Sequence, residues 1–265
     1  MNDVLLKYRI IGKGYPVVFL HGFLESKSMW RGLGLEKLPI KSILIDLPGH
    51  GESINHDDSD PSIEFMAKKV LEVVSFLECQ NFSIIGHSMG GYVALAVKKE
   101  ITVFKEVSPA MKCEKVILLN SNFWEDSVSK KKDRLRVVDI VMKNKSLFIK
   151  ESIPNLFVHK EKYRKEMDEL ISESSMMDKH SISYASLAMR NRNNHSKLVS
   201  DCKNDFLLIQ GELDTIIPIE IMLQQIEKID IQFKIIPNAG HMAHLESPNE
   251  VLHTISAFLN VSIEE

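Results

Sequence analysis

The chain has 265 residues, a formal net charge of −3 and 44% hydrophobic residues. This length fits one α/β domain with a substantial core, and the acidic balance disfavours a general nucleic-acid-binding protein, which normally carries a basic excess. The longest apolar runs, such as 17–20 and 116–119, are too short for a membrane span. The first residues lack a secretion-signal pattern, and the three scattered cysteines show neither metal nor disulfide spacing. We therefore expect a cytoplasmic protein with reduced thiols.

Short apolar runs that end in turns recur along the chain, and most are followed by a helical pattern. The runs are 17–20, 43–45, 82–85, 116–119, 206–209 and 233–236. Because they are apolar on both faces, they fit a parallel sheet that is covered by helices on both sides. The alternation of strands and helices predicts a doubly wound, mostly parallel α/β sheet.

The start of two helices can be predicted from capping patterns. Asp60 can cap a helix whose first position is Pro61, and apolar residues at helical spacing between 63 and 77 give it a buried stripe. Near the C-terminus, Ser247-Pro248-Asn249-Glu250 has the spacing of a capping box before a final amphipathic helix.

The segment from about 122 to 201 interrupts the alternation. It contains no convincing strand, is charged and helix-prone, and has one apolar stripe formed by Leu135, Val138, Val141 and Met142. We interpret residues 122–201 as a helical lid over the carboxyl ends of the strands. The α/β core would then consist of residues 1–121 and 202–265, on either side of this insertion.

The strongest chemical signal is Gly86-His87-Ser88-Met89-Gly90-Gly91, between a predicted strand and a helix-like segment. A nucleophile on a sharp turn from strand to helix needs small residues two positions before and after it, because strand and helix pass closely there. The pattern occurs by chance in many proteins, but the strand and helix around it make chance unlikely here. Ser88 is therefore the predicted nucleophile.

A serine hydroxyl needs a general base, and that base needs an orienting acid. His241 follows the last predicted strand directly and is the preferred base, while His244 is its competitor. Asp214 lies in the turn after the preceding strand and is the preferred acid, with Glu212 and Asp126 as alternatives.

Two backbone N–H groups are predicted to form an oxyanion hole. Phe23 follows an early strand in His21-Gly22-Phe23, and Met89 follows the nucleophile, so both N–H groups can face a developing oxyanion. The aromatic residues Trp30, Phe123 and Trp124 are candidates for the substrate pocket. Each of the three fits an ordinary core position equally well.

These motifs, in this order, resemble the α/β-hydrolase superfamily over nearly the whole chain. The matching segments are His21-Gly22-Phe23, residues 46–53, the Ser88 turn, Gly211-Glu212-Leu213-Asp214 and Gly240-His241. The resemblance implies an α/β-hydrolase fold, triad roles for Ser88, Asp214 and His241, and no metal or organic cofactor. Within the superfamily, the chain is most similar to small cytosolic esterases, such as pimeloyl-carrier-protein methyl ester esterases and enol-lactonases.

The residue types at the turn narrow the chemistry that the resemblance implies. Dehalogenases and epoxide hydrolases of this fold carry aspartate where this chain has Ser88, and many C–C hydrolases carry asparagine where it has His87. We therefore expect a serine carboxylesterase that cleaves a small-molecule ester with a small or medium acyl group through an acyl-enzyme. The alternatives are thioester, lactone or C–C bond hydrolysis or a lyase step on the same residues, or a hydrolase-like protein that only binds a ligand.

A basic cluster at the start of the predicted lid suggests a further partner. Its members are Lys130, Lys131, Lys132, Arg134 and Arg136. Such a cluster could attract an acidic acyl carrier protein, because complementary charges steer association. A solvated helix face is the alternative explanation.

Overall fold

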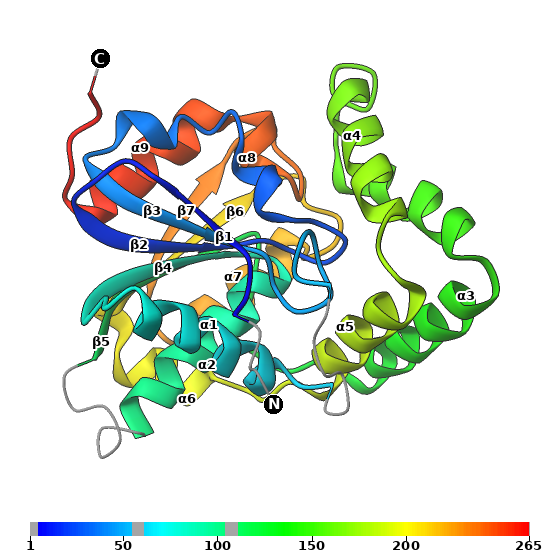
Figure 1. The fold of residues 1–265 in the computed structure, drawn as a ribbon, viewed down its shortest axis with the longest axis horizontal. Coiled ribbons are helices and arrows are strands. Elements are labelled where there is room, and N and C mark those ends of the chain that lie inside the picture. The colour runs from blue at the N-terminus through cyan, green and yellow to red at the C-terminus, as the bar shows by residue number, and fades with distance from the viewer. Residues whose placement is uncertain (1–4, 55–60, 104–110, 265) are drawn as a thin grey trace.

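The computed structural model describes residues 5–54, 61–103 and 111–264. Within them lies a seven-stranded sheet in the order β1-β3-β2-β4-β5-β6-β7 (Figure 1). The strands are β1 (Tyr8–Ile11), β2 (Tyr15–Leu20), β3 (Ile40–Ile45), β4 (Asn81–His87), β5 (Lys112–Leu119), β6 (Phe206–Gly211) and β7 (Gln232–Ile236). β1 pairs with β3 in the antiparallel sense, and the remaining pairs are parallel. The predicted doubly wound, mostly parallel sheet is confirmed.

Each apolar run of the sequence lies inside one of the strands β2 to β7. The central strands are buried because helices cover both faces, which is why these segments are apolar on both sides. The edge strand β1 was not predicted. Its side chains are half-buried or exposed, so it lacks the apolar run that identifies the others.

Two hydrophobic clusters fill the spaces on the two faces of the sheet. On one face lie α1 (Ile63–Phe76), α2 (Met89–Val103), α6 (Ser196–Asp201) and α7 (Ile219–Ile226). On the other lie the short 3-10 helices η1 (Lys27–Trp30) and η2 (Leu35–Lys37), together with α8 (Ala243–Glu246) and α9 (Pro248–Leu259). Burial on both faces holds the ends of the parallel strands in register.

The structure corrects the predicted start of one helix and the predicted cap of another. α1 begins at Ile63, and the hydroxyl of Ser62 caps it by accepting a hydrogen bond from the N–H of Phe65 at 3.1 Å. Pro61 therefore precedes the helix, and Asp60 lies outside the described residues. α9 begins at Pro248 as predicted, but the predicted capping box is wrong. The side chain of Ser247 makes no capping hydrogen bond, because its backbone is turned away from the usual capping geometry.

The chain between β5 and β6 is helical wherever it forms regular structure. It consists of α3 (Val128–Ser152), η3 (Ile153–Leu156), α4 (Arg164–Ser175), α5 (Lys179–Asn191), α6 and η4 (Lys203–Asp205). We use "lid helices" for α3, η3, α4 and α5, residues 128–191. They stand to one side of the sheet in Figure 1 and share a third hydrophobic cluster. α6 does not share that cluster. Its Val199 is buried in the core cluster that contains α1 and α2.

The apolar stripe predicted for the first lid helix is only partly buried. Val141 is buried, but Leu135 and Met142 are 42% and 39% exposed. The helix is interrupted at Asn144, whose φ of −152° and ψ of 77° are not helical. The Asn144 side chain accepts a hydrogen bond from the N–H of Leu147 at 3.0 Å and so caps the second half of α3. The predicted stripe lies before this interruption, and the exposure of Leu135 and Met142 shows that it is not a continuous buried face.

Candidate active site

Ser88 lies on the turn between β4 and α2 and has a left-handed backbone with φ of 49°. Only small residues fit around this turn. A Cβ atom on Gly86 would lie 2.3 Å from the carbonyl carbon of Gly90, and one on Gly90 would lie 2.4 Å from the carbonyl oxygen of Leu20. Left-handed backbone is costly for any residue other than glycine, so the packing of the turn must compensate for it. The turn holds the Ser88 side chain at the carboxyl edge of the sheet.

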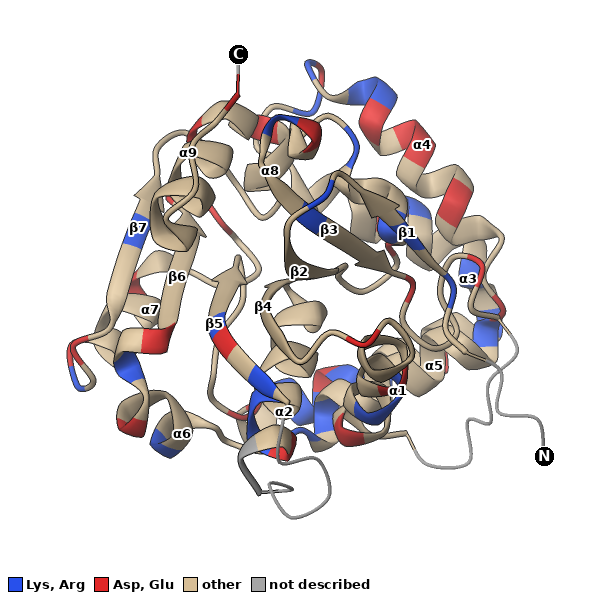
Figure 2. Ribbon diagram, turned by 60° about the vertical axis from the view of Figure 1, so that its left-hand side comes forward, with Lys and Arg blue, Asp and Glu red and all other residues tan. Residues whose placement is uncertain are grey.

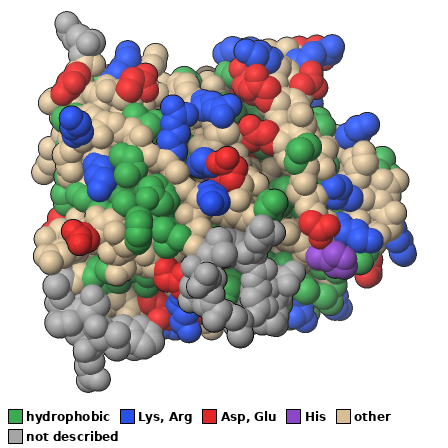
Figure 3. Space-filling model, in the orientation of Figure 1, with side chains coloured by type: hydrophobic (Ala, Val, Ile, Leu, Met, Phe, Trp, Pro, Cys, Tyr) green, Lys and Arg blue, Asp and Glu red, His purple; other side chains and the backbone are tan. Residues whose placement is uncertain are grey.

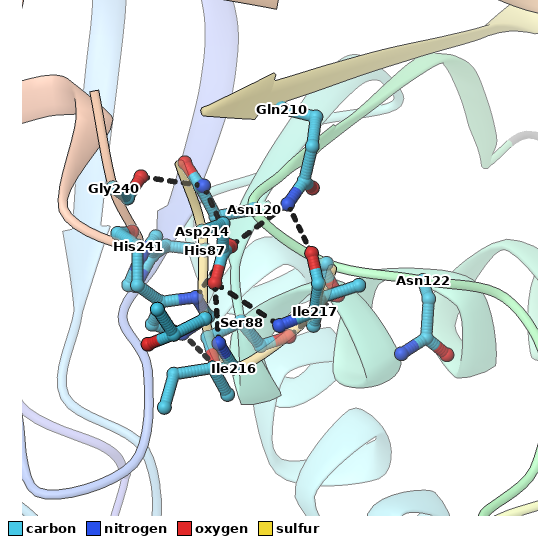
Figure 4. Close-up of polar contacts among 12 residues, drawn as sticks. His87, Ser88, Asn120, Asn122, Gln210, Asp214, Ile216, Ile217, Gly240 and His241 are labelled. Atoms are coloured by element: carbon cyan, nitrogen blue, oxygen red, sulfur yellow. Dashed lines mark hydrogen bonds and ion pairs between the residues drawn. The ribbon is translucent and has the colours of Figure 1, made fainter. Parts of the chain in front are cut away.

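Ser88, His241 and Asp214 are joined by two hydrogen bonds (Figure 4). His241 Nε2 lies 3.0 Å from Ser88 Oγ, and His241 Nδ1 lies 2.8 Å from Asp214 Oδ2. The ionised carboxylate only accepts hydrogen bonds, so it selects the tautomer with the proton on Nδ1. Nε2 is then free to accept the hydroxyl proton of Ser88. His241 and Asp214 are buried, whereas Ser88 is partly exposed.

The carboxylate of Asp214 is fully surrounded by hydrogen-bond donors. Oδ2 also accepts from Asn120 Nδ2 at 2.9 Å and Gln210 Nε2 at 2.8 Å. Oδ1 accepts from the N–H groups of Ile216 and Ile217 at 2.8 and 3.0 Å. Burial alone would raise the pKa of Asp214, but the adjacent imidazole and these donors lower it. The acid therefore stays ionised in spite of its burial.

Sequence reasoning missed the two side-chain amides that hold the acid. Asn120 directly follows the apolar run of β5, and Gln210 interrupts the end of β6. Both are completely buried. The sequence did contain a signal for them, because each is a polar residue at the carboxyl end of a buried strand. Ligands bind and active sites form at that edge of a parallel sheet.

The alternative acid and base residues lie elsewhere. Glu212 accepts a backbone hydrogen bond from the next loop, and Asp126 forms ion pairs with Arg192 and Arg134 at 2.7 and 3.1 Å. His244 is buried, and neither of its ring nitrogens has a hydrogen-bond partner among the described residues. The structure thus brings His241 and Asp214 to Ser88, and not these three residues.

The predicted oxyanion donors lie on adjacent segments. Leu20, at the end of β2, pairs with Gly86 in β4, so the loop containing Phe23 begins beside the Ser88 turn. Met89 is buried at the first position of α2. The Phe23 ring lies 6.4 Å from the ring of Phe148 on the lid helix α3. The role of the two N–H groups as oxyanion donors stays a prediction.

The three aromatic pocket candidates lie in different environments. Trp30 is 2% exposed and packs edge-on against Phe19, with ring centroids 5.2 Å apart, in the cluster beside α9. Phe123 is 1% exposed in the opposite core cluster. Trp30 and Phe123 are thus core residues, which was the alternative to a pocket position in the sequence analysis. Trp124 lines a cavity of about 750 Å³ that also borders residues 215–218 of the acid loop, and its contact with substrate stays a prediction.

Most of the basic cluster on the first lid helix is paired with acidic neighbours. The ion pairs are Lys131–Glu125 at 2.6 Å, Arg134–Asp126 at 3.1 Å and Arg136–Asp133 at 2.7 Å. Figure 2 shows mostly acidic residues along α4, and the face in Figure 3 carries both signs interspersed. These pairs reduce the net positive charge available to an acyl carrier protein, whose docking stays a prediction.

One part of the lid is hydrogen-bonded to the loop that contains His241. The His241 N–H donates to the carbonyl oxygen of Leu156 at 3.1 Å. The carboxylate of Glu246 accepts from the Val158 N–H at 2.8 Å and from the Gly240 N–H at 2.6 Å. The lid therefore helps to fix the backbone on which the predicted base is carried.

Two kinds of feature are absent from the described residues. They contain no cluster of three or more His, Cys, Asp or Glu side chains arranged to hold a metal ion. They also contain no helix both long and apolar enough to cross a membrane.

Comparison with known proteins identifies the family. The chain is 26% identical over 261 residues to "Putative esterase/lipase 2" of Mycoplasma pneumoniae, an alignment that covers 94% of this chain and 90% of that protein. Its structure matches a thermophilic esterase from Thermogutta terrifontis with a TM-score of 0.83 and 27% identity, over 96% and 93% of the two chains.

A further structural match supports the fold alone. The enol-lactonase from Burkholderia xenovorans LB400 superposes with a TM-score of 0.80 and 18% identity, over 96% of each chain. The sequence model of the alpha/beta hydrolase family matches residues 17–254. With the sheet order and the Ser88 turn described above, the chain belongs to the α/β-hydrolase family.

Proposed function

We propose that this hydrolase is a carboxylesterase in which Ser88 is the nucleophile, His241 the general base and Asp214 the orienting acid. The observation that carries the proposal is the continuous hydrogen-bonded series from Ser88 Oγ through the His241 ring to Asp214. The esterase-like relatives support the choice of an ester over other acyl substrates.

The geometry supports a two-step acyl transfer. Ser88 Oγ attacks the ester carbonyl carbon while its proton moves to His241 Nε2. The carbonyl oxygen becomes an oxyanion that the N–H groups of Phe23 and Met89 would bind. When the C–O bond to the alcohol breaks, the leaving oxygen takes the proton from His241, and the acyl group remains on Ser88.

The second step reverses the direction of proton transfer. A water molecule attacks the acyl-enzyme carbonyl and gives one proton to His241. Collapse of the second tetrahedral intermediate returns that proton to Ser88 Oγ and releases the carboxylic acid. Throughout, Asp214 keeps its charge and stabilises the imidazolium form of His241.

A group of partly buried apolar side chains supports an acyl group of small or medium size. Phe23, Phe148, Leu156 and Leu245 pack against the hydrophobic cluster of the lid, and the Phe23 ring lies 6.4 Å from that of Phe148. Such side chains offer surface on which an acyl chain can exclude water. They do not identify the alcohol.

A fluorophosphonate probe and a panel of p-nitrophenyl esters with acyl chains of increasing length test the proposal. We expect Ser88→Ala to abolish both labelling and ester hydrolysis, while Ser181→Ala, at a partly buried serine on α5, behaves as the unaltered protein. Labelling or hydrolysis that survives Ser88→Ala contradicts the proposal. A thioester, a lactone and a vinylogous C–C substrate in the same panel distinguish the other reactions that these residues could perform.

A further inference from the structure

A second buried acid–histidine pair, Glu25 and His87, lies behind the proposed catalytic residues. Glu25 is 3% exposed and lies in the loop after β2, two residues beyond Phe23. His87 is fully buried and directly precedes Ser88. Glu25 Oε2 lies 3.0 Å from His87 Nδ1 and accepts a hydrogen bond from the Gly22 N–H at 2.5 Å. The other ring nitrogen, His87 Nε2, lies 2.8 Å from the carbonyl oxygen of His241.

The partners of the His87 ring fit a proton on each nitrogen. A carbonyl oxygen can only accept, so Nε2 must carry a hydrogen and donate to His241. An ionised Glu25 also only accepts, and its Oε2 then takes hydrogen bonds from both the Gly22 N–H and His87 Nδ1. In this arrangement His87 is an imidazolium and Glu25 a carboxylate. Charge-assisted hydrogen bonds of this kind are stronger than neutral ones.

The neighbouring charged and titratable groups are consistent with a single imidazolium at His87. Its ring lies 5.1 Å from the ring of His241 and 5.0 Å from the ring of His244, and Asp214 also acts on it electrostatically. His21, on the loop after β2, and His244 are the other histidines near Glu25. Burial lowers the pKa of His21, and it lowers the pKa of His244 to about 3, so both are neutral near pH 7.

The pKa values of the pair itself follow the same geometry. Burial opposes the charged form of each group, but the attraction between them outweighs it. The pKa of Glu25 falls to about 2, and the pKa of His87 is raised above its usual value.

We propose that Glu25 and His87 form a buried ion pair that positions the Phe23 N–H and the proposed base His241. The pair does so by linking Gly22, in the loop after β2, to the backbone carbonyl of His241. The inference rests on the proposed function, because it assigns a role relative to Ser88 and His241. Neither residue needs to touch substrate. The pair connects the loop after β2, the Ser88 turn and the loop after β7 through hydrogen bonds to Gly22 and His241.

The absence of a side chain at Gly22 fits this role. A Cβ atom there would lie 2.7 Å from Glu25 Oε2 and 2.8 Å from His87 Nδ1. The pair therefore lies directly against the backbone that leads to the Phe23 N–H. A shift of the pair would move that N–H, and errors of about 1 Å in the position of reacting groups cost on the order of 100-fold in rate.

The protonation of His87 can be measured without any activity. Nitrogen-15 NMR of histidine-labelled protein at pH 7, assigned by loss of the signal in His87→Gln, should show both His87 ring nitrogens protonated. Ser88→Ala protein should give the same His87 signals. A neutral tautomer at His87 overturns the proposal, whether or not the protein is an esterase. Conversely, hydrolysis that persists in Ser88→Ala removes the proposed function and leaves the NMR result intact.

A double-mutant cycle tests the positioning role. We expect Glu25→Gln and His87→Gln each to lower kcat by about 10- to 100-fold with KM within about twofold, because the pair orders the reacting groups and not the substrate. The double variant should lose no more than the worse single variant, since each change already breaks the pair. His50→Gln, at a buried histidine outside the pair, should keep kcat within about threefold. Unchanged kcat in either single variant, or losses that multiply in the double variant, overturns the positioning role.

Discussion

Asn120 donates from one nitrogen, Nδ2, to both Asp214 Oδ2 at 2.9 Å and the carbonyl oxygen of Gly240 at 3.0 Å. It thereby joins the proposed acid to the residue that precedes the proposed base. The backbone of Asn120 is left-handed, with φ of 45°, a conformation that asparagine tolerates better than most residues. One side chain at the end of β5 thus sets the spacing of two loops that are distant in the sequence.

Removing this amide should slow the reaction without unfolding the protein. Asn120→Gly deletes the donor and accepts the left-handed backbone, so we expect kcat to fall about 10-fold with little change in KM. Asn122→Ala is the matched control, because Asn122 donates to Tyr92 and does not contact Asp214. Initial rates over a range of ester concentrations measure both constants. Equal losses in the two variants would show that Asn120 acts through general stability.

The ionised form of Asp214 should be required for the correct tautomer of His241. Asp214→Asn keeps the size of the side chain but can offer an N–H toward Nδ1, which favours the wrong tautomer. We expect kcat to fall on the order of 10³- to 10⁴-fold. Glu212→Gln, two residues away, changes a side chain that accepts a hydrogen bond from the Asn238 N–H, and it should stay within about twofold of the unaltered rate. A large loss in Glu212→Gln would reassign the acid.

Relief of backbone strain should distinguish two inactive variants at the nucleophile. Ser88→Ala keeps a side chain at φ of 49°, whereas Ser88→Gly can adopt this conformation freely. Relief of strain stabilises Ser88→Gly, while the greater freedom of glycine in the unfolded chain offsets part of that gain. We expect Ser88→Gly to be more stable than Ser88→Ala by up to about 1 kcal/mol in total. Urea denaturation of the two proteins measures the difference. A less stable Ser88→Gly would mean that the turn is not strained.

Acid should weaken the contribution of Glu25 to stability over a defined range. Burial alone raises its pKa, but His87 reverses that effect and brings the folded value to about 2, below the ordinary value of 4.5. A lowered folded pKa gives stability that is complete above the unfolded pKa and is lost as pH falls toward the folded one. The free energy of unfolding of the unaltered protein should therefore approach that of Glu25→Gln between pH 4.5 and pH 2. A constant gap across that range contradicts the ion pair.

The carboxylate of Glu246 should affect both kcat and the attachment of the lid near His241. Glu246→Gln replaces one acceptor oxygen by an NH₂ group, so either the Gly240 N–H or the Val158 N–H loses its partner. We expect kcat to fall several-fold and limited proteolysis within residues 156–163 to become faster. Glu250→Gln, whose residue pairs on the surface with Lys234 at 2.8 Å, is the control. Unchanged proteolysis in Glu246→Gln would place the lid contacts elsewhere.

The elements that could be predicted from the sequence are those with an unambiguous local signal. The buried strands β2 to β7 have apolar runs, and the Ser88 turn has glycines that no other residue can replace. Ser88, His241 and Asp214 could be selected because each follows a strand at the same edge of the sheet. By contrast, β1 is stabilised mainly by its pairing with β3, which leaves little trace in its own residues.

The supporting residues of the site could not be predicted because their role depends on contacts across long stretches of chain. Glu25 and His87 are 62 positions apart, and Asn120 and Asp214 are 94 apart. The core positions of Trp30 and Phe123 were equally open, since an aromatic residue suits a core and a pocket alike. The first lid helix was harder still to predict. It is interrupted at Asn144, and Leu135 and Met142 of its apolar stripe are exposed.

The attachment of the lid near His241 limits how substrate can enter. Swinging the whole lid outward would take the Val158 N–H away from the Glu246 carboxylate and break the hydrogen bond between the His241 N–H and the Leu156 carbonyl oxygen, exposing buried polar groups without partners. The second half of α3, capped by Asn144, continues into the attached segment. A substrate of the proposed esterase that entered near the first turns of α3, where Val128 is 74% exposed, would leave these hydrogen bonds intact. Entry at that end would keep the backbone of His241 in place beside Ser88.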